Sequence, residues 1–162
     1  QLRVLHLLPG LEHAAGVVLL VKIGQGARVR CGGRVLEDGE LGRGNFLEPA
    51  LIENVSPENL LAKQEVFGPV LSLISVRDAN QAIEVANSVE YGLAASVFTR
   101  DVDEALRFVR ESESGMVHVN HGTNSEAHMP FGGVKGSGLG AYSIGHSNLE
   151  FCTNVKAAYF QG

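Results

Sequence analysis

Residues 70–120 read VLSLISVRDANQAIEVANSVEYGLAASVFTRDVDEALRFVRESESGMVHVN, and this stretch decides the fold. Three of its segments are short, apolar and rich in β-branched residues, which predicts strands over 70–76, 93–99 and 116–120. The connections between them are too long for hairpins, so we expect consecutive strands to be parallel and adjacent, joined by right-handed helical crossovers. The stretch therefore predicts an α/β fold with an open, mainly parallel sheet and flanking helices.

Each of the two connections carries the signals of a helix. Asp78 is followed by Gln81 and Asp101 by Glu104, the spacing of a capping box at a helix start. Gly115 is placed where it could end the second helix. Apolar residues recur in both helices at the spacing of a single buried stripe, namely Ala79, Ala82, Ile83 and Ala86 in the first and Val102, Ala105, Leu106 and Val109 in the second.

Outside this stretch the patterns are shorter. Ser56 followed by Pro57 has the residue types of an N-cap and first turn, which predicts a helix over 58–63. The remaining predicted elements are a helix over 14–25, a strand over 28–31, an extended segment over 46–52, a helix over 143–150 and a final strand over 153–160.

Composition limits the classes of protein that the chain can represent. The 162 residues carry 13 Lys+Arg against 18 Asp+Glu, a net charge of −5, and 44% of them are hydrophobic. These values are typical of one soluble globular domain. The mildly acidic balance makes nucleic acid an unexpected partner. No membrane span or signal peptide is visible, so we expect a cytoplasmic protein without membrane association, in which Cys31 and Cys152 are half-buried, reduced thiols.

Glycine is over-represented and unevenly placed. It occupies 20 of 162 positions, about 12% against a typical ~7%, with dense groups at 24–44 and 132–145. The second group lies in the segment 121–145, directly after the predicted strand 116–120. Open α/β sheets bind ligands beyond the carboxyl ends of their strands, so this loop is the first candidate site.

Several chemical interpretations of these regions compete. His118, His121, His128 and His146, with Glu126 as an orienting carboxylate, could suggest a metal site, but their spacing matches no zinc motif and favours polar loop or core histidines. The GSGLG run at 136–140 resembles a phosphate cradle, yet no strand precedes it, which favours a structural turn. Cys31 is disfavoured as a nucleophile because no base lies nearby in the sequence and a strand there would bury the thiol.

The string EVFGPV at residues 65–70 is the sharpest local signal. A Gly-Pro turn before a buried strand would hold the two preceding side chains rigidly. The Glu65 carboxylate could accept hydrogen bonds from ribose hydroxyls, and the Phe67 ring could cover a flat heterocycle. A surface glutamate beside a core phenylalanine is the competing interpretation, with about equal weight on local grounds.

Five motifs in order give the chain its resemblance to a known family. They are GNFLEP at 44–49, EVFGPV at 65–70, ANSVEYGLAA at 86–95 (followed by VFTRD at 97–101), GMVHVN at 115–120 and PFGGVKGSGLG at 130–140. With them the chain resembles the C-terminal part of the aldehyde dehydrogenase superfamily over most of residues 43–160. An NAD- or NADP-dependent oxidation of an aldehyde to a carboxylic acid is the activity that this resemblance implies for the complete enzyme.

The resemblance also implies roles for single residues. Glu65 would bind the nicotinamide ribose hydroxyls and Phe67 would pack near the nicotinamide ring. Phe131 would form a wall of the aldehyde tunnel, with Ser125 at a nearby pocket-lining position. In some members the backbone carbonyls of the turn from Lys135 to Gly138 hold a potassium ion; no other metal is expected.

The departures from the family set a limit on catalysis. Its nucleophile lies in a Gly-Gln-x-Cys setting, whereas residues 24–27 read GQGA, and neither the base glutamate nor the dinucleotide-binding domain has a counterpart. We therefore expect 1–152 to be part of a catalytic domain, poorly matched over 1–27, and 153–162 to be an oligomerisation strand and tail. In a homo-oligomer, 153–160 would join a neighbouring subunit's sheet. A non-catalytic truncated paralogue acting by oligomerisation, and a metal-binding domain around residues 118–128, remain the alternatives.

Overall fold

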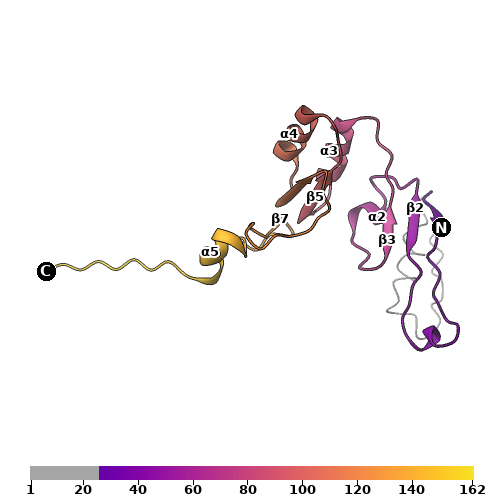
Figure 1. The fold of residues 1–162 in the computed structure, drawn as a ribbon, viewed down its shortest axis with the longest axis horizontal. Helices are drawn as coiled ribbons and strands as arrows, with labels where there is room; N and C mark the ends of the chain where they lie inside the picture. Colours follow the sequence, from indigo (N-terminus) through magenta and orange to yellow (C-terminus); the bar gives the residue numbers. More distant parts are fainter. Residues whose placement is uncertain (1–25) are drawn as a thin grey trace. The chain divides into compact units, whose positions relative to one another are not determined.

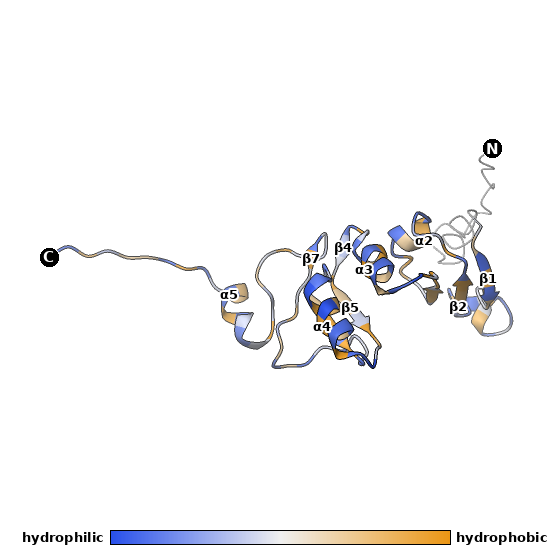
Figure 2. Ribbon diagram, turned by 90° about the horizontal axis from the view of Figure 1, so that it is seen from above, coloured by the Kyte–Doolittle hydropathy of each residue, from blue (hydrophilic) through white to orange (hydrophobic). Residues whose placement is uncertain are grey.

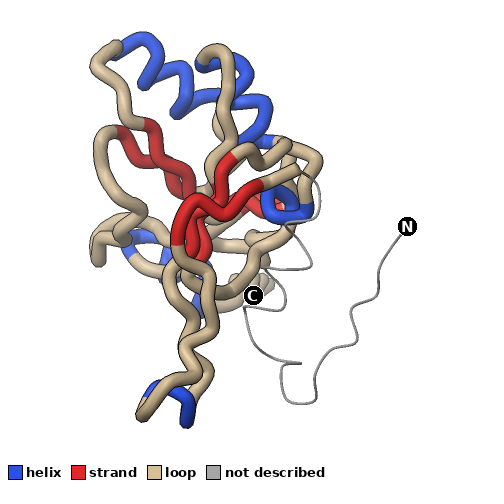
Figure 3. The backbone as a smooth tube through the Cα atoms, turned by 90° about the vertical axis from the view of Figure 1, so that its right-hand side faces the viewer, coloured by secondary structure: helices blue, strands red, loops and turns tan. Residues whose placement is uncertain are grey.

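The structure is a computed structural model that describes residues 26–162, so the predicted helix over 14–25 lies outside the described residues. The chain divides into two compact units at the boundary between Val76 and Arg77, and each is described by itself (Figure 1). Long loops connect the elements, and much of the described chain is neither helix nor strand (Figure 3). Within the described residues, no helix has the length and apolarity that crossing a membrane requires.

The first unit is built on a three-stranded sheet in the order β1-β2-β3. Strand β1 covers Arg28–Cys31, as predicted, and pairs antiparallel with β2 at Ala50–Glu53. Strand β3, at Val70–Ser72, pairs parallel with β2. Figure 2 shows β1 as largely hydrophilic and β2 as hydrophobic, the pattern of an exposed edge strand beside a core strand.

A small core forms on this sheet. Ala50 and Ile52 of β2, Val55 and Leu61 are its buried members. Short 3-10 helix η1 covers Leu41–Arg43, and helix α2 covers Leu60–Lys63. The predicted cap of α2 is wrong: the buried Asn59, not Ser56, is the N-cap, and its Oδ1 accepts a hydrogen bond from the Leu61 N–H at 2.8 Å.

The second unit begins with helix α3. Its elements are α3 (Ala79–Asn87), β4 (Tyr91–Gly92), β5 (Ala94–Val97), α4 (Val102–Glu111), β6 (Met116–Val119), β7 (Val134–Lys135), 3-10 helix η2 (Gly145–Ser147) and α5 (Asn148–Cys152). Strands β5 and β6 are parallel and joined by α4, as predicted. Strands β4 and β7 form a separate antiparallel pair. The chain is thus an α/β protein with parallel strand pairs and flanking helices.

The expected adjacency of all three central strands is wrong for the first of them. Strand β3 pairs with β2, whereas β5 pairs with β6. The apolar pattern of 70–76 identifies a strand but carries no information on its neighbour. The extended segment 46–52 supplies the strand β2, which pairs with β3 through a register that sets Leu51 beside Leu71.

The two helix starts of the second unit are confirmed. The Asp78 Oδ1 accepts a hydrogen bond from the Gln81 N–H at 2.9 Å, and the Asp101 Oδ1 accepts from the Glu104 N–H at 3.1 Å. The predicted end at Gly115 is wrong, because α4 ends at Glu111 with Ser112 as its C-cap.

Helix α4 buries a narrower face than its apolar spacing predicts. Ala105 and Phe108 are buried, whereas Val102, Leu106 and Val109 are 69%, 50% and 45% exposed. Charged residues complete the exposed surface. There Arg107 lowers the pKa of the Glu111 carboxyl below its ordinary value, because the guanidinium donates hydrogen bonds to that carboxylate.

Two predictions for the C-terminal part have different outcomes. Elements η2 and α5 together occupy most of the predicted helix 143–150 and extend it to Cys152. Residues 153–162 are exposed throughout and form no ladder with any other residue from 26 onward. Figure 1 draws them as an extended loop after α5, so the predicted strand over 153–160 is not formed in the described part of the chain. A ladder with a second chain stays a prediction.

The burial pattern predicts unequal effects of truncating two apolar residues in the first sheet. Replacement of Ile52 by alanine should lower the free energy of unfolding by about 2–5 kcal/mol, because this side chain is 0% exposed. Leu71→Ala, on the neighbouring strand but 60% exposed, should cost less than about 1 kcal/mol. Urea titration followed by circular dichroism measures both, and equal losses would contradict the assigned core.

Candidate functional site

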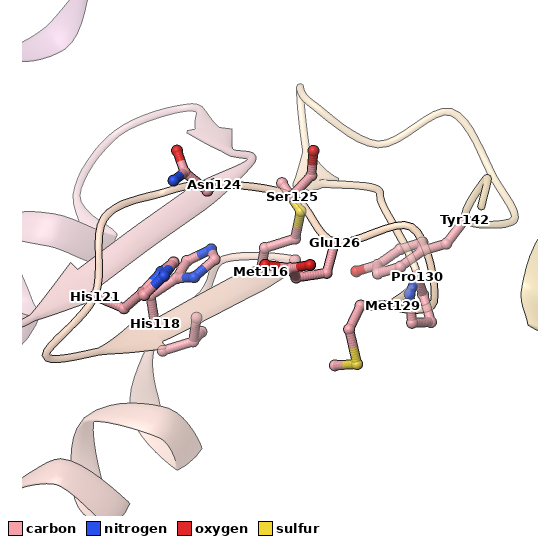
Figure 4. A pocket seen from close by; sticks show the side chains of 11 residues that line it. Met116, His118, His121, Asn124, Ser125, Glu126, Met129, Pro130 and Tyr142 are labelled. Carbon is pink, nitrogen blue, oxygen red and sulfur yellow. The ribbon is translucent and has the colours of Figure 1, made fainter. Parts of the chain in front are cut away.

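A pocket of about 450 Å³ lies in the second unit, alongside β6 and the loop that leaves its carboxyl end. Met116 and Val117 of β6, with Met129 and Pro130 of the loop, give it an apolar lining, and the Tyr142 ring adds an aromatic wall. Figure 4 shows the side chains of Met116, Met129, Pro130 and Tyr142 around one hollow. Shape and lining are those of a small-molecule site.

Polar groups enter the same pocket from β6 and the loop. His118 and His121 stack with ring centroids 5.8 Å apart and planes inclined by 19°. Asn124, Ser125 and Glu126 follow in the loop and line the pocket beside them. The pocket therefore combines an apolar floor with a few convergent polar groups, which can orient a ligand.

One polar atom beside the pocket lacks a partner. The Nε2 atom of His118 is buried and makes no hydrogen bond in the described part of the chain. A buried ring nitrogen without a partner costs free energy, and a ligand hydroxyl or carbonyl could satisfy it. The neighbouring His121 is different, because its Nδ1 contacts the Gly122 carbonyl oxygen at 2.6 Å.

Asn120 fixes the point at which the loop leaves β6. It has a left-handed backbone (φ 53°), and its amide makes two bonds to the backbone that follows β5. The Thr99 N–H donates to the Asn120 Oδ1 at 2.9 Å, and the Asn120 Nδ2 donates to the Thr99 carbonyl at 2.9 Å. These bonds continue the β5–β6 pairing by one side chain and so position the pocket loop.

The turn at residues 132–138 is anchored by Lys135. Its ammonium donates to the carbonyls of Asn87, at 2.6 Å, and Val89, at 3.2 Å, and it pairs with the Glu113 carboxylate. A cation at these carbonyls complements the C-terminal end of α3. The turn is thereby held against α3 and the segment after α4.

The same turn accounts for one glycine of the GSGLG run at 136–140, for which a phosphate cradle and a structural turn were the two interpretations. A Cβ on Gly138 would lie 2.5 Å from the Gly133 carbonyl oxygen, so the backbone approaches itself too closely for any side chain. Close backbone approach explains this glycine without a ligand. The Lys135 carbonyl, one of the predicted potassium ligands, accepts the Gly138 N–H at 3.2 Å, and a potassium site there stays a prediction.

The predicted aldehyde-facing residues differ in their placement. Ser125 lines the pocket. Phe131 is not among its described lining residues; it adjoins the lining residue Pro130, and its backbone pairs with Ser143 through hydrogen bonds of 2.7 and 2.9 Å. Tyr142 was missed, because a tyrosine in an aperiodic glycine-rich loop carries no signal of which residues it will face.

Glu65 and Phe67 lie in the first unit, on the turn between α2 and β3. Val66 packs against the core of that unit, which directs its two neighbours outward. The Phe67 ring is 90% exposed and its backbone is left-handed (φ 56°), an unusual conformation for a bulky residue. The structure therefore contradicts a core phenylalanine and places an exposed carboxylate and an exposed ring two residues apart on one turn.

The structure gives no support to a catalytic Cys31 or to a metal site among the described histidines. Both Cys31 and Cys152 are exposed free thiols, so the predicted burial of Cys31 is wrong; β1 is an edge strand whose residues are all exposed. Within residues 26–162, no three His, Cys, Asp or Glu side chains gather closely enough to hold a metal ion.

Comparison with known proteins places this architecture. A profile of the aldehyde dehydrogenase family matches residues 15–158. The alpha-ketoglutarate semialdehyde dehydrogenase of Haloferax volcanii is 43% identical over 137 residues, 83% of this chain and 28% of that protein. The 4-trimethylaminobutyraldehyde dehydrogenase of Bos taurus is 39% identical over 150 residues, 91% of this chain and 30% of that protein.

Solved structures agree with this placement. The crystal structure of betaine aldehyde dehydrogenase from Staphylococcus aureus in complex with NAD+ matches with a TM-score of 0.79 and 32% identity, covering 85% of this chain and 27% of that one. The α/β fold is thus one that also occurs in aldehyde dehydrogenases of known structure. The chain belongs to the aldehyde dehydrogenase family and spans about three-tenths of the length of these relatives.

The anchoring role of Lys135 gives a test of the site's support. Lys135→Met should lower the free energy of unfolding of the second unit by about 1–3 kcal/mol, because two carbonyl bonds and an ion pair are lost. Lys156→Met, in the exposed tail, is the matched control and should change stability by less than about 0.5 kcal/mol. Hydrogen exchange of the α3 and β4 amides measures the effect, and indistinguishable variants would contradict the anchor.

Proposed function

We propose that this chain forms the C-terminal part of the catalytic domain of an NAD(P)-dependent aldehyde dehydrogenase. The observation that carries the proposal is the pocket beside β6, with Ser125 in its lining, in a chain of this family. The pocket receives the aldehyde, and its apolar lining excludes water from the bound chain of the substrate. Residues 1–152 supply this part, and the exposed free thiols fit a reducing compartment, the cytoplasm.

Glu65 and Phe67 are proposed to contact the dinucleotide. The exposed Phe67 ring can cover the flat nicotinamide, and the adjacent Glu65 carboxylate can accept hydrogen bonds from ribose hydroxyls. Both side chains stand on a turn with no apolar cover of their own, which fits a surface that a ligand completes. NAD or NADP, when bound, supplies the hydride acceptor for aldehyde oxidation.

The chemistry needs groups that these 162 residues do not provide. The cysteine nucleophile and base glutamate expected for the family have no counterpart at the matching positions of this sequence. We infer that the 162-residue chain alone does not oxidise aldehydes. The chain positions substrate and nicotinamide; the nucleophile must come from a segment that these residues do not include.

A chimera tests this function directly. Residues 43–162 would replace the matching C-terminal region of the Haloferax volcanii relative, and reduction of NAD+ or NADP+ with an aldehyde panel would be followed at 340 nm. We expect turnover by the chimera and none by the 162-residue chain. A folded chimera without turnover, or clear activity of the chain alone, would contradict the proposal. Within the chimera, Glu65→Gln should raise the KM for the dinucleotide about tenfold, while Glu84→Gln, at an exposed glutamate of α3, should leave it unchanged.

The exposed tail supports a further proposal about assembly. Val155, Tyr159 and Phe160 are 101%, 96% and 96% exposed, a large apolar area for a solvated segment. An extended segment with free backbone N–H groups can add a strand to the sheet of a second copy. We therefore propose that Thr153–Phe160 pairs with a neighbouring subunit in a homo-oligomer.

Backbone donors of the tail are the target of its test. The double variant Ala157→Pro/Ala158→Pro removes consecutive N–H groups, which point to opposite edges of a strand, so one of them must face any partner. We expect a lower oligomer mass in light scattering after gel filtration. Gln161→Pro, beyond the segment, is the control and should keep the mass of the unmodified chain. An unchanged mass in the double variant would exclude this strand as the interface.

A further inference from the structure

The pocket beside β6 has an unbalanced charge. Glu126 is the one Asp or Glu among its described lining residues, and none of those residues is Lys or Arg. In Figure 4 the Glu126 carboxylate and the Tyr142 hydroxyl point toward the middle of the hollow. A glutamate carboxylate carries a full negative charge at neutral pH and offers only acceptor oxygens. A ligand group that reaches it is therefore favoured when it is positively charged.

Aromatic surfaces surround this carboxylate. Tyr142 presents a ring, and the stacked His118 and His121 present two more. Ring faces attract cations, most strongly alkylammonium groups that carry little water. The thioethers of Met116 and Met129 add polarizable, apolar contact for methyl groups.

We propose that this pocket recognises an organic cation, so that the aldehyde substrate carries an alkylammonium group, with Glu126 as the residue that determines this specificity. That the bound cation is a substrate rests on the proposed function, whereas the cation site itself rests on the residues that line the pocket. Relatives named for a trimethylamino-aldehyde and for a keto-acid semialdehyde show that opposite ligand charges occur in the family. An aldehyde that also carries a carboxylate would place that negative charge near the Glu126 carboxylate, and the described lining contains no Lys or Arg to compensate it.

The chain contains a built-in reporter for this site. It has two methionines, and both line the pocket. Methyl-¹³C-methionine labelling of the full 162-residue chain therefore gives two signals, each from the pocket. The titration uses choline as the cation, 3,3-dimethylbutan-1-ol as its uncharged isostere and 4-hydroxybutanoate as an anion, at pH 8 so that histidine is ordinarily neutral.

We expect choline to shift both methyl signals saturably and to bind at least about tenfold more tightly than the isostere. The anion should cause no saturable shift. Glu126→Gln should weaken the affinity for choline about tenfold and leave the affinity for the isostere unchanged. Glu150→Gln removes an equal charge from α5 and is the control, which should bind choline as tightly as the unmodified chain. Tyr142→Phe, which keeps the ring, should retain choline binding.

Equal affinity for choline and its isostere, tighter binding of the anion, or an unchanged choline affinity in Glu126→Gln would each overturn the proposal. The ligand comparison on the unmodified chain decides the matter even if a variant fails to fold. Because the titration needs neither turnover nor dinucleotide, its failure is separate from a failure of the proposed function, which the chimera measures. An active chimera together with absent choline binding would reject the cation site alone.

Discussion

The ammonium of Lys135 is the contact on which the second unit depends most. It donates to the backbone carbonyls of Asn87 and Val89 and pairs with Glu113. Asn87 in turn accepts from the Glu113 N–H at 2.9 Å and donates to the Glu111 carbonyl at 2.8 Å. One side chain thus joins the ends of α3 and α4 to a turn that lies far away in the sequence. Groups that act in such a network support one another more than separate pairs do.

This anchoring has a consequence for the pocket. The turn that Lys135 holds leads back to Pro130 in one direction and on to Tyr142 in the other, and both residues line the pocket. A Cβ on Gly132 would clash with the Tyr142 ring, so the backbone of the turn also sets where that ring lies. The aromatic wall is therefore placed by backbone geometry rather than by a core of its own, and it can hold its position beside an otherwise exposed loop.

Local signals in the sequence were sufficient to predict where helices and strands form, but not which strands pair with one another. Asp78 and Asp101 cap helices as predicted, because a cap depends on residues within one turn. The pairing of β3 with β2 was not predictable, because the periodicity of a strand carries no information on which strand lies beside it. The exposed stripe of α4 was misjudged for a related reason: Val102 and Leu106 repeat at helical spacing whether or not anything packs on them. Tyr142 was missed because it lines the pocket only where the loop, many residues after β6, comes back beside that strand.

Recognition of the family and the proposed specificity for a substrate rest on different kinds of residue. The motifs that carry the resemblance to the family, such as EVFGPV and PFGGVKGSG, form turns whose backbone is constrained, and Phe67 and Lys135 both have left-handed φ within them. Such backbone constraints do not depend on which ligand binds. If the proposed function holds, selection among aldehydes would fall to side chains between the motifs, where no backbone requirement limits the choice of residue. Glu126 is such a residue: it lies in a loop that Asn120 holds at one end and the Lys135 turn at the other, so its charge can change without disturbing the frame that places it.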